Sequence, residues 1–274
     1  MSVTIKVNGT ILTTFDSNER GNRYFSYKEM RNNGDIRNAL QLNINHERGE
    51  NKGLLEAIFY GSENAFNGRM PDEPDLDNIL LYNMDLSTSK FQIVCLEKRI
   101  EPNRTDTLYE YNVKDSSVDD VLQKLGNDYT INAEIDGNSK EERSLGVTVF
   151  FYNQFRKWLT TNKCNTYFGS SSFELVIEYN GHHSLSESSF IKHAVDGTVS
   201  AMQTCDFNRI EELKLKHVDP GKPELAILDG ENVISFGRNN NVNWHPQDHL
   251  ISKLVVIKNP NLEHYLRIRV KATA

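Results

Sequence analysis

Alternating apolar and polar positions along the first half of the chain predict several strands, each with one buried face. These strands are predicted at 53–61, 90–100 and 107–115, and the segment 3–12 is predicted to be a hairpin around an Asn-Gly turn or a strand with a bend. We expect the strands over 90–100 and 107–115 to pair antiparallel around a Pro-Asn turn. Helical spacing predicts a short helix near 35–42 and helices over 75–84 and 117–128. The last helix has a serine at its start and a glycine at its end, which are common helix-start and helix-stop signals.

The second half of the chain shows a similar succession of strands and helices. The apolar run "LGVTVFFYN" predicts a strand over 145–153, and a helix is expected to follow it over 154–162. Further on, the pattern predicts a strand over 172–181, a helix over 188–203, two short strands within 224–237 and a terminal hairpin over 252–272.

These elements define an α+β protein with two similar halves. The polar run "EIDGNSKEERS" favours a linker at 135–144, which would separate residues 1–134 from residues 145–274. We expect each half to contain a small mixed or antiparallel sheet with one or two packed helices.

The two halves also share residues at a constant separation. An ungapped alignment with an offset of 119 matches Ile58 with Ile177 and Asp77 with Asp196. Both halves then end in a Ser-Lys strand, a turn containing Asn and Pro, and a second strand. The pattern indicates an internal duplication. The alternative is chance similarity between two α+β units.

Composition narrows the class of protein. The chain has 274 residues, of which 38% are hydrophobic, enough for one large domain or two smaller ones. We expect its start, "MSVTIKVNG", not to act as a signal peptide, and no stretch approaches the roughly 20 apolar residues of a membrane-spanning helix. Cys95, Cys164 and Cys205 are far apart and form no CxxC pair, so we expect reduced thiols in a cytoplasmic protein.

The net charge of −7 bears on possible partners. An acidic chain is not typical of proteins that coat nucleic acid, although a nucleic-acid enzyme can concentrate its basic residues in a local groove. No Walker A, GxGxxG, GxSxG or kinase signature is present. The net charge therefore does not exclude an enzyme that acts on nucleic acid, but it does not support one.

The segment "MPDEPDLDNILLYNM" at 70–84 contains the strongest candidate for chemistry. Asp75 and Asp77 stand two residues apart at the start of the helix expected over 75–84, where they could share one Mg²⁺ ion. Such an ion can activate water and stabilise a phosphoryl transition state. The alternative is structural, because aspartate is a favoured residue at a helix start.

The run "PDLDNILLYNM" resembles the PDxDN helix start of the RusA-type Holliday-junction endonucleases. The resemblance implies a Mg²⁺-dependent nuclease with Asp75 and Asp77 as ligands, and a second half that is a diverged copy. In that copy Asp196 corresponds to Asp77, while Ala194 stands at the position of Asp75. The segment "LDGENVISF" is similar to the later aspartate segment of the family, which makes Asp229 a further possible ligand.

Histidines and one tryptophan supply secondary candidates in the second half. His193 stands three residues before Asp196 on the expected helix, so the two could act as an acid-base pair or form a structural surface pair. Trp244 and His245 lie in the Asn-rich run "NNNVNWHPQDH", which could be a binding loop for a base or a peptide, or a loop anchored by its tryptophan.

Two functions remain open from the sequence. The first is a Mg²⁺-dependent nuclease or phosphodiesterase that acts on nucleic acid through Asp75 and Asp77. The second is a non-catalytic α+β subunit that binds a protein partner or nucleic acid in a bacterial defence or mobile-element complex. Leu81, at the position where the RusA-type helix carries a lysine, suits the second function.

Overall fold

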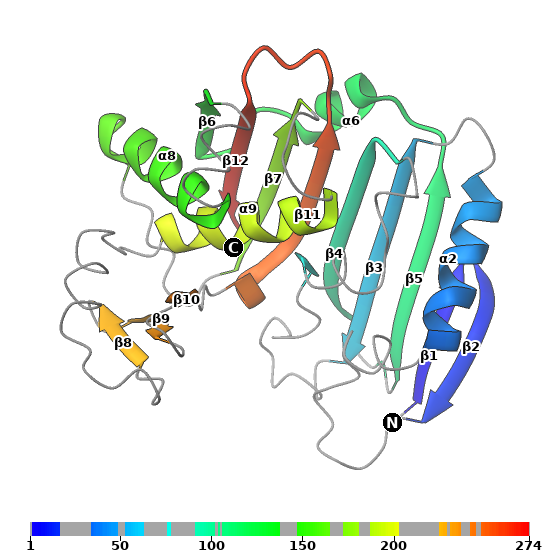
Figure 1. The fold of residues 1–274 in the computed structure, drawn as a ribbon. Helices are drawn as coiled ribbons and strands as arrows, with labels where there is room; N and C mark the ends of the chain where they lie inside the picture. The colour runs from blue at the N-terminus through cyan, green and yellow to red at the C-terminus, as the bar shows by residue number, and fades with distance from the viewer. Residues whose placement is uncertain are drawn as a thin grey trace.

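The structure is a computed structural model. It describes residues 2–16, 34–48, 53–62, 76–77, 91–101, 104, 106–137, 147–164, 172–180, 187–202, 225–228, 231–236, 242–244 and 248–273. Nine strands form one mixed sheet in the order β2-β1-β5-β3-β4-β11-β7-β12-β6, and helices pack on both of its faces (Figure 1). The α+β class is therefore confirmed.

The strands of the large sheet come from the whole length of the chain. Their bounds are β1 Ser2–Val7, β2 Thr10–Asp16, β3 Leu54–Ser62, β4 Ile93–Glu101, β5 Thr107–Lys114, β6 Ile131–Ile135, β7 Phe173–Tyr179, β11 Ile251–Lys258 and β12 Leu266–Ala272. A second sheet has the order β10-β9-β8, with β8 Leu225–Leu228, β9 Glu231–Phe236 and β10 Val242–Trp244. The two short strands expected within 224–237 are β8 and β9, which pair antiparallel.

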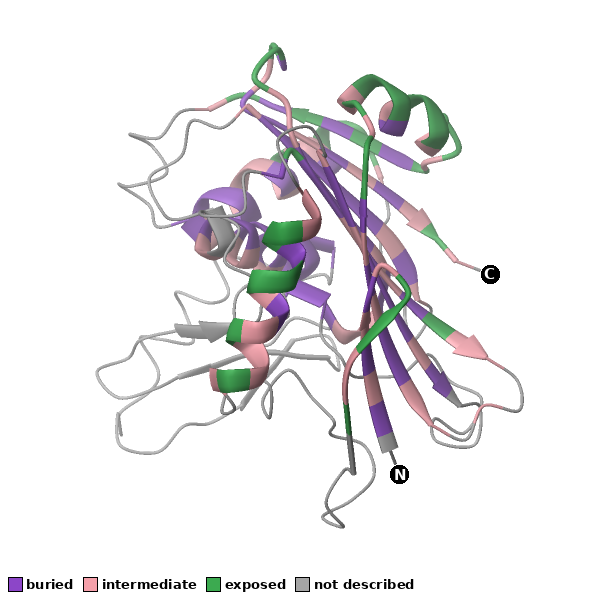
Figure 2. Ribbon diagram, turned by 90° about the vertical axis from the view of Figure 1, so that its right-hand side faces the viewer, coloured by how far each residue is buried: buried purple, intermediate pink, exposed green. Residues whose placement is uncertain are grey.

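Of the helices in the described part of the chain, three cover one face of the large sheet. They are α2 Gly34–Arg48, α8 Val147–Thr161 and α9 Glu187–Met202, and they share the main hydrophobic core with that face (Figure 2). On the other face, α6 Val118–Leu125 covers a smaller core. A short 3-10 helix, η2 Asp248–Leu250, leads directly into β11. Among the described helices, none is long and apolar enough to cross a membrane.

The boundaries of α6 follow from its end signals. The Ser117 hydroxyl accepts from the backbone N–H of Asp120, and the Asp120 carboxylate accepts from the backbone N–H of Ser117. This reciprocal cap satisfies two donors that the first helical turn leaves unpaired. Gly126 ends the helix with φ of 65°, a conformation that favours glycine. The helix expected within 117–128 is therefore confirmed.

The strand predicted over 145–153 is wrong, because its described residues, 147–153, lie in α8. Val147, Phe150, Phe151, Phe155 and Leu159 are buried, at the three- and four-residue spacing of a helix with one buried face. An unbroken apolar run of this length does not by itself distinguish a buried strand from a buried helix.

The hairpins predicted for 90–100 with 107–115 and for 252–272 are also wrong in their pairing. Strands β4 and β5 do run in opposite directions, but β3 lies between them, parallel to β4 and antiparallel to β5. In the same way β7 lies between β11 and β12. Turn residues indicate that the chain reverses direction. They do not indicate whether the two strands that the turn connects pair with each other or with a third strand between them.

The inserted strands give the two halves the same local topology. In each half, the chain runs from a central strand, β3 or β7, into a helical segment. The central strand has a parallel neighbour on one side, β4 or β11, and an antiparallel neighbour on the other, β5 or β12. The halves meet where β4 pairs antiparallel with β11, so the two sheets expected from the sequence are one continuous sheet. The strand β6, which was not predicted and lies at the expected end of the first half, pairs with β12. Descent of both halves from one ancestor remains a prediction.

The ungapped alignment of the halves does not match equivalent strand positions. Ala57 and Phe59 contribute to the main core, so Ile58 between them faces the other side of the sheet. Ile177 itself belongs to the main core on the helix-covered face. A shift of one residue reverses the face of every side chain in a strand, so the offset of 119 fails within β3 and β7.

Candidate metal centre

Asp77 lies in a helical segment of which Leu76 and Asp77 are described, and both are fully buried. Leu76 contributes to the main hydrophobic core and anchors this stretch over the sheet. A carboxylate removed from water in this way needs a positive or hydrogen-bonding partner close to it.

Helix α9 supplies the partner and a second carboxylate. Lys192 and Asp196 are four residues apart, and their Nζ and Oδ1 atoms are 2.7 Å apart. Helical residues at this spacing lie on the same face, one turn apart. The next residue, Gly197, allows this turn of α9 to pack closely against α8, since a Cβ there would lie 2.5 Å from the carbonyl oxygen of Thr148.

Asp248 brings the third carboxylate from η2, directly before β11. The turn is held by Lys98 of β4, whose Nζ donates to the carbonyl oxygen of His249 over 2.8 Å. Lys98 is itself buried, at 2% exposure, on the helix-covered face of β4. The position of Asp248 therefore depends on a side chain from the first half of the chain.

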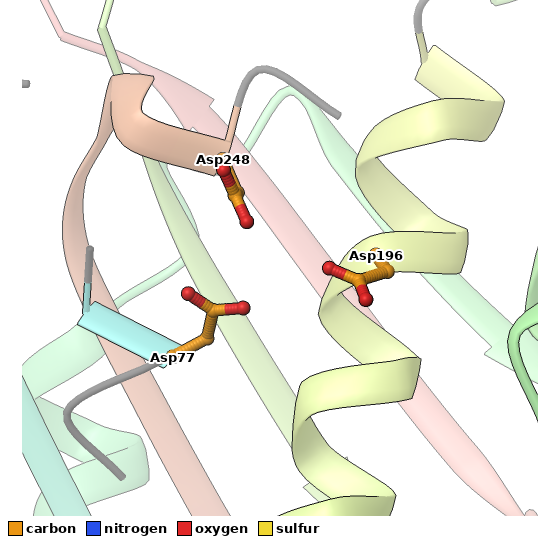
Figure 3. Close-up of side chains that lie close together, drawn as sticks. All are labelled: Asp77, Asp196 and Asp248. Carbon is orange, nitrogen blue, oxygen red and sulfur yellow. The ribbon is translucent and has the colours of Figure 1, made fainter. Parts of the chain in front are cut away.

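The three carboxylates converge on one point (Figure 3). One oxygen from each of Asp77, Asp196 and Asp248 lies within 4.8 Å of the other two. The ammonium group of Lys192 lies among them, with Nζ 2.7 Å from Asp77, 2.7 Å from Asp196 and 3.2 Å from Asp248. Burial opposes ionisation of Lys192, but the three carboxylates outweigh it and hold the pKa of Lys192 above its usual range.

One ammonium does not neutralise three carboxylates, so these four side chains carry a formal net charge of −2 when all are ionised. At an effective dielectric constant of about 20, the attraction of Asp77 to Lys192 over 2.7 Å is about 6 kcal/mol. Each of the two repulsions of Asp77 by a carboxylate within 4.8 Å is about 3.5 kcal/mol or more. For Asp77 the repulsion is as large as the attraction.

This arrangement can bind a metal ion. Carboxylate oxygens are the ligands that hard divalent cations such as Mg²⁺, Mn²⁺ and Ca²⁺ prefer. A divalent cation would bring two positive charges to these three carboxylates. The identity of the metal does not follow from the ligands, because all three cations accept them.

The sequence prediction located two of the three carboxylates. Asp77 was a predicted ligand and Asp196 its predicted counterpart, and the structure brings them together. Asp75, Asp229 and His245 lie outside the described residues, and of Trp244 only the backbone at the end of β10 is described. Asp248 and Lys192 were missed.

His193 occupies the neighbourhood of the acidic cluster without pairing with it. Its Nδ1 is 2.9 Å from the hydroxyl of Thr148 on α8, whereas Asp196 pairs with Lys192. Burial and the nearby charge of Lys192 lower the pKa of His193. At neutral pH its imidazole is therefore uncharged.

The described cysteines are unpaired thiols, as expected from their spacing. They are Cys95 and Cys164, while Cys205 lies outside the described residues. Burial raises the pKa of Cys95 to about 11, which keeps it protonated and poorly reactive. Neither thiol lies in the acidic cluster.

Comparison with known proteins gives no further guide to the site. A scan against protein-family models, a search of curated proteins and a search of solved structures each found no match. The similarity to RusA-type endonucleases therefore remains a prediction from the sequence, and the case for a function rests on the cluster itself.

Proposed function

We propose that this protein is a metal-dependent phosphodiesterase that acts on nucleic acid, with Mg²⁺ held by Asp77, Asp196 and Asp248. The observation that carries the proposal is the convergence of three carboxylates, from three separate segments, on one point. Divalent cations such as Mg²⁺ are bound through carboxylate oxygens of this kind.

Each side chain has a defined part in the proposed reaction. The metal ion would lower the pKa of a bound water and balance the charge of the scissile phosphate. The three aspartates would hold the ion in place, and Lys98 would position Asp248 by holding the turn at His249. Lys192, one helical turn from Asp196, would offer a positive group to the phosphate.

A second candidate is the non-catalytic subunit that binds a protein partner or nucleic acid. The observation that favours it is the position of Lys192, whose ammonium already contacts all three carboxylates. In this case the cluster would be a structural link between the helical segment at Asp77, α9 and η2.

A cleavage assay separates the two candidates. The protein is incubated with branched, duplex and single-stranded nucleic acids in the presence of Mg²⁺, Mn²⁺ or EDTA, beside the variants Asp77→Asn and Asp196→Asn. We expect cleavage that requires the metal and falls at least about 100-fold in both variants, because even indirect partners of metal ligands contribute 10- to 100-fold.

The matched control is Asp119→Asn, which removes an exposed carboxylate from α6 on the opposite face of the sheet. This variant should cleave as the wild type does. Cleavage that persists in Asp77→Asn, or no metal-dependent cleavage in the wild type, would reject the phosphodiesterase and leave the binding subunit.

A further inference from the structure

The ammonium of Lys192 occupies the place that a metal ion would take. Its Nζ lies 2.7 to 3.2 Å from an oxygen of each of the three aspartates. A divalent cation bound to the same oxygens would lie about 2.0–2.6 Å from them, within the same small space. The ammonium and the metal ion therefore exclude each other.

We propose that Lys192 is a built-in counter-cation that holds the three carboxylates together before the metal binds, and that the metal must displace it. This inference rests on the proposed metal site, and it adds a competitor that sets how tightly the site binds. The ammonium keeps the carboxylates from repelling one another and so preserves the geometry of the site.

The structure gives Lys192 a route out of the cluster. Its side chain is 19% exposed, so the end of the cluster at Lys192 reaches solvent, while Asp77 is fully buried. Lysine has a flexible four-carbon stem, which allows its ammonium to move several ångströms while the backbone of α9 stays in place. A displaced Lys192 stays beside the site, where a phosphate of the substrate would be bound.

Competition of this kind reduces the apparent affinity for metal. A site whose binding-competent form is only partly populated binds its ligand more weakly in proportion to that population. Removing the ammonium should therefore tighten metal binding and, in the absence of metal, destabilise the fold by exposing the carboxylates to their own repulsion. A purely structural ion pair predicts the destabilisation but no recovery with metal.

The test uses Lys192→Met, which keeps the length of the stem and removes the charge. Calorimetric titration with Mn²⁺ should give a dissociation constant at least tenfold lower than that of the wild type. The melting temperature of Lys192→Met should be below that of the wild type in EDTA and should regain the difference at saturating Mn²⁺. Lys124→Met, at an exposed position on α6, is the control and should match the wild type.

A second measurement uses the wild-type chain, in case Lys192→Met does not fold without metal. Acylation of lysines with a small amine-reactive ester is followed by mass spectrometry, with Lys124 as the internal reference. Labelling of Lys192 should be slow in EDTA and should rise at least fivefold at saturating Mn²⁺, while Lys124 stays unchanged.

The outcomes distinguish this inference from the proposed function. Metal binding that is equal or weaker in Lys192→Met, or labelling of Lys192 that Mn²⁺ does not change, overturns the inference. Tighter binding by Lys192→Met together with a wild type that cleaves no nucleic acid supports the inference and rejects the phosphodiesterase. A chain that binds no Mn²⁺ with or without Lys192 overturns the inference together with the metal site.

Discussion

Replacement of Asp77 by asparagine tests whether the acidic cluster is built for a metal or for stability. The substitution removes one negative charge from a fully buried position and keeps the size of the side chain. Within the acidic cluster, Asp77 is attracted to Lys192 by about 6 kcal/mol and repelled by the two other carboxylates by about 7 kcal/mol together, so these contributions nearly cancel. We therefore expect the free energy of unfolding without metal to change by less than about 1 kcal/mol.

The same substitution should abolish the stabilisation that metal provides. The assay is urea denaturation in EDTA and again at saturating Mn²⁺. The wild type should gain stability with the logarithm of the ratio of the metal concentration to its dissociation constant, and Asp77→Asn should gain little. Asp119→Asn, the exposed control on α6, should behave as the wild type in both buffers.

The result that would refute this reasoning is a large loss without metal. Removing one partner of a buried, charge-matched ion pair destabilises a protein by about 3–5 kcal/mol. A loss of that size in Asp77→Asn, with no effect of Mn²⁺ on the wild type, would show that Asp77 is a structural partner of Lys192. The excess charge would then be balanced by groups other than a metal ion.

Two further predictions concern the packing of α9 and a surface charge cluster. Gly197→Ala should destabilise the fold by about 1–3 kcal/mol in urea denaturation. Its Cβ would lie 2.5 Å from the Thr148 carbonyl oxygen, a backbone atom that cannot move away by a change of rotamer. A variant as stable as the wild type would contradict the close packing of α9 and α8. The hydrogen bond to Asp136 and the charge of Glu134 raise the pKa of His264 above its usual 6.5. Its contribution to stability should therefore be complete below about pH 6.5, reach about 0.2–1 kcal/mol, and be lost as the pH rises through the raised pKa. An equal difference between His264→Gln and the wild type in urea denaturation at pH 6 and pH 9 would contradict this pairing.

Local signals in the sequence were enough to predict elements whose ends are marked. Helix α6 has a serine cap and a glycine stop, and both are used as expected. Helix α8 has no comparable cap and stop residues at its ends. The sequence prediction divided its residues after Asn153 into a strand and a helix, and so missed the helical spacing that runs through both parts. The buried positions from Val147 to Leu159 follow that spacing across the division.

The pairing of strands depends on contacts that no local pattern reports. The turns after β4 and β11 were correctly predicted to reverse the chain. The insertion of β3 between β4 and β5, and of β7 between β11 and β12, depends on the whole sheet. For the same reason, an alignment that preserved identical residues placed Ile58 and Ile177 on opposite faces.

The site was predictable only in part. Asp77 stood out because it stands near a predicted helix start, and Asp196 because it aligns with Asp77 at the offset of 119. The spacing of Lys192 and Asp196 also corresponds to one helical turn. Asp248 lies one turn before a strand, between two histidines that drew attention to a different chemistry. Its place beside Asp77 follows from the packing of η2 against β4 and α9, which only the tertiary structure reveals.

The most direct test of the account is a diffraction experiment on crystals grown with Mn²⁺, recorded where manganese scatters anomalously. The account predicts an anomalous peak among the carboxylates of Asp77, Asp196 and Asp248, at about 2.0–2.6 Å from their oxygens, with Lys192 moved away. Crystals at saturating Mn²⁺ that show no peak there, and Lys192 still in contact with all three aspartates, would contradict it.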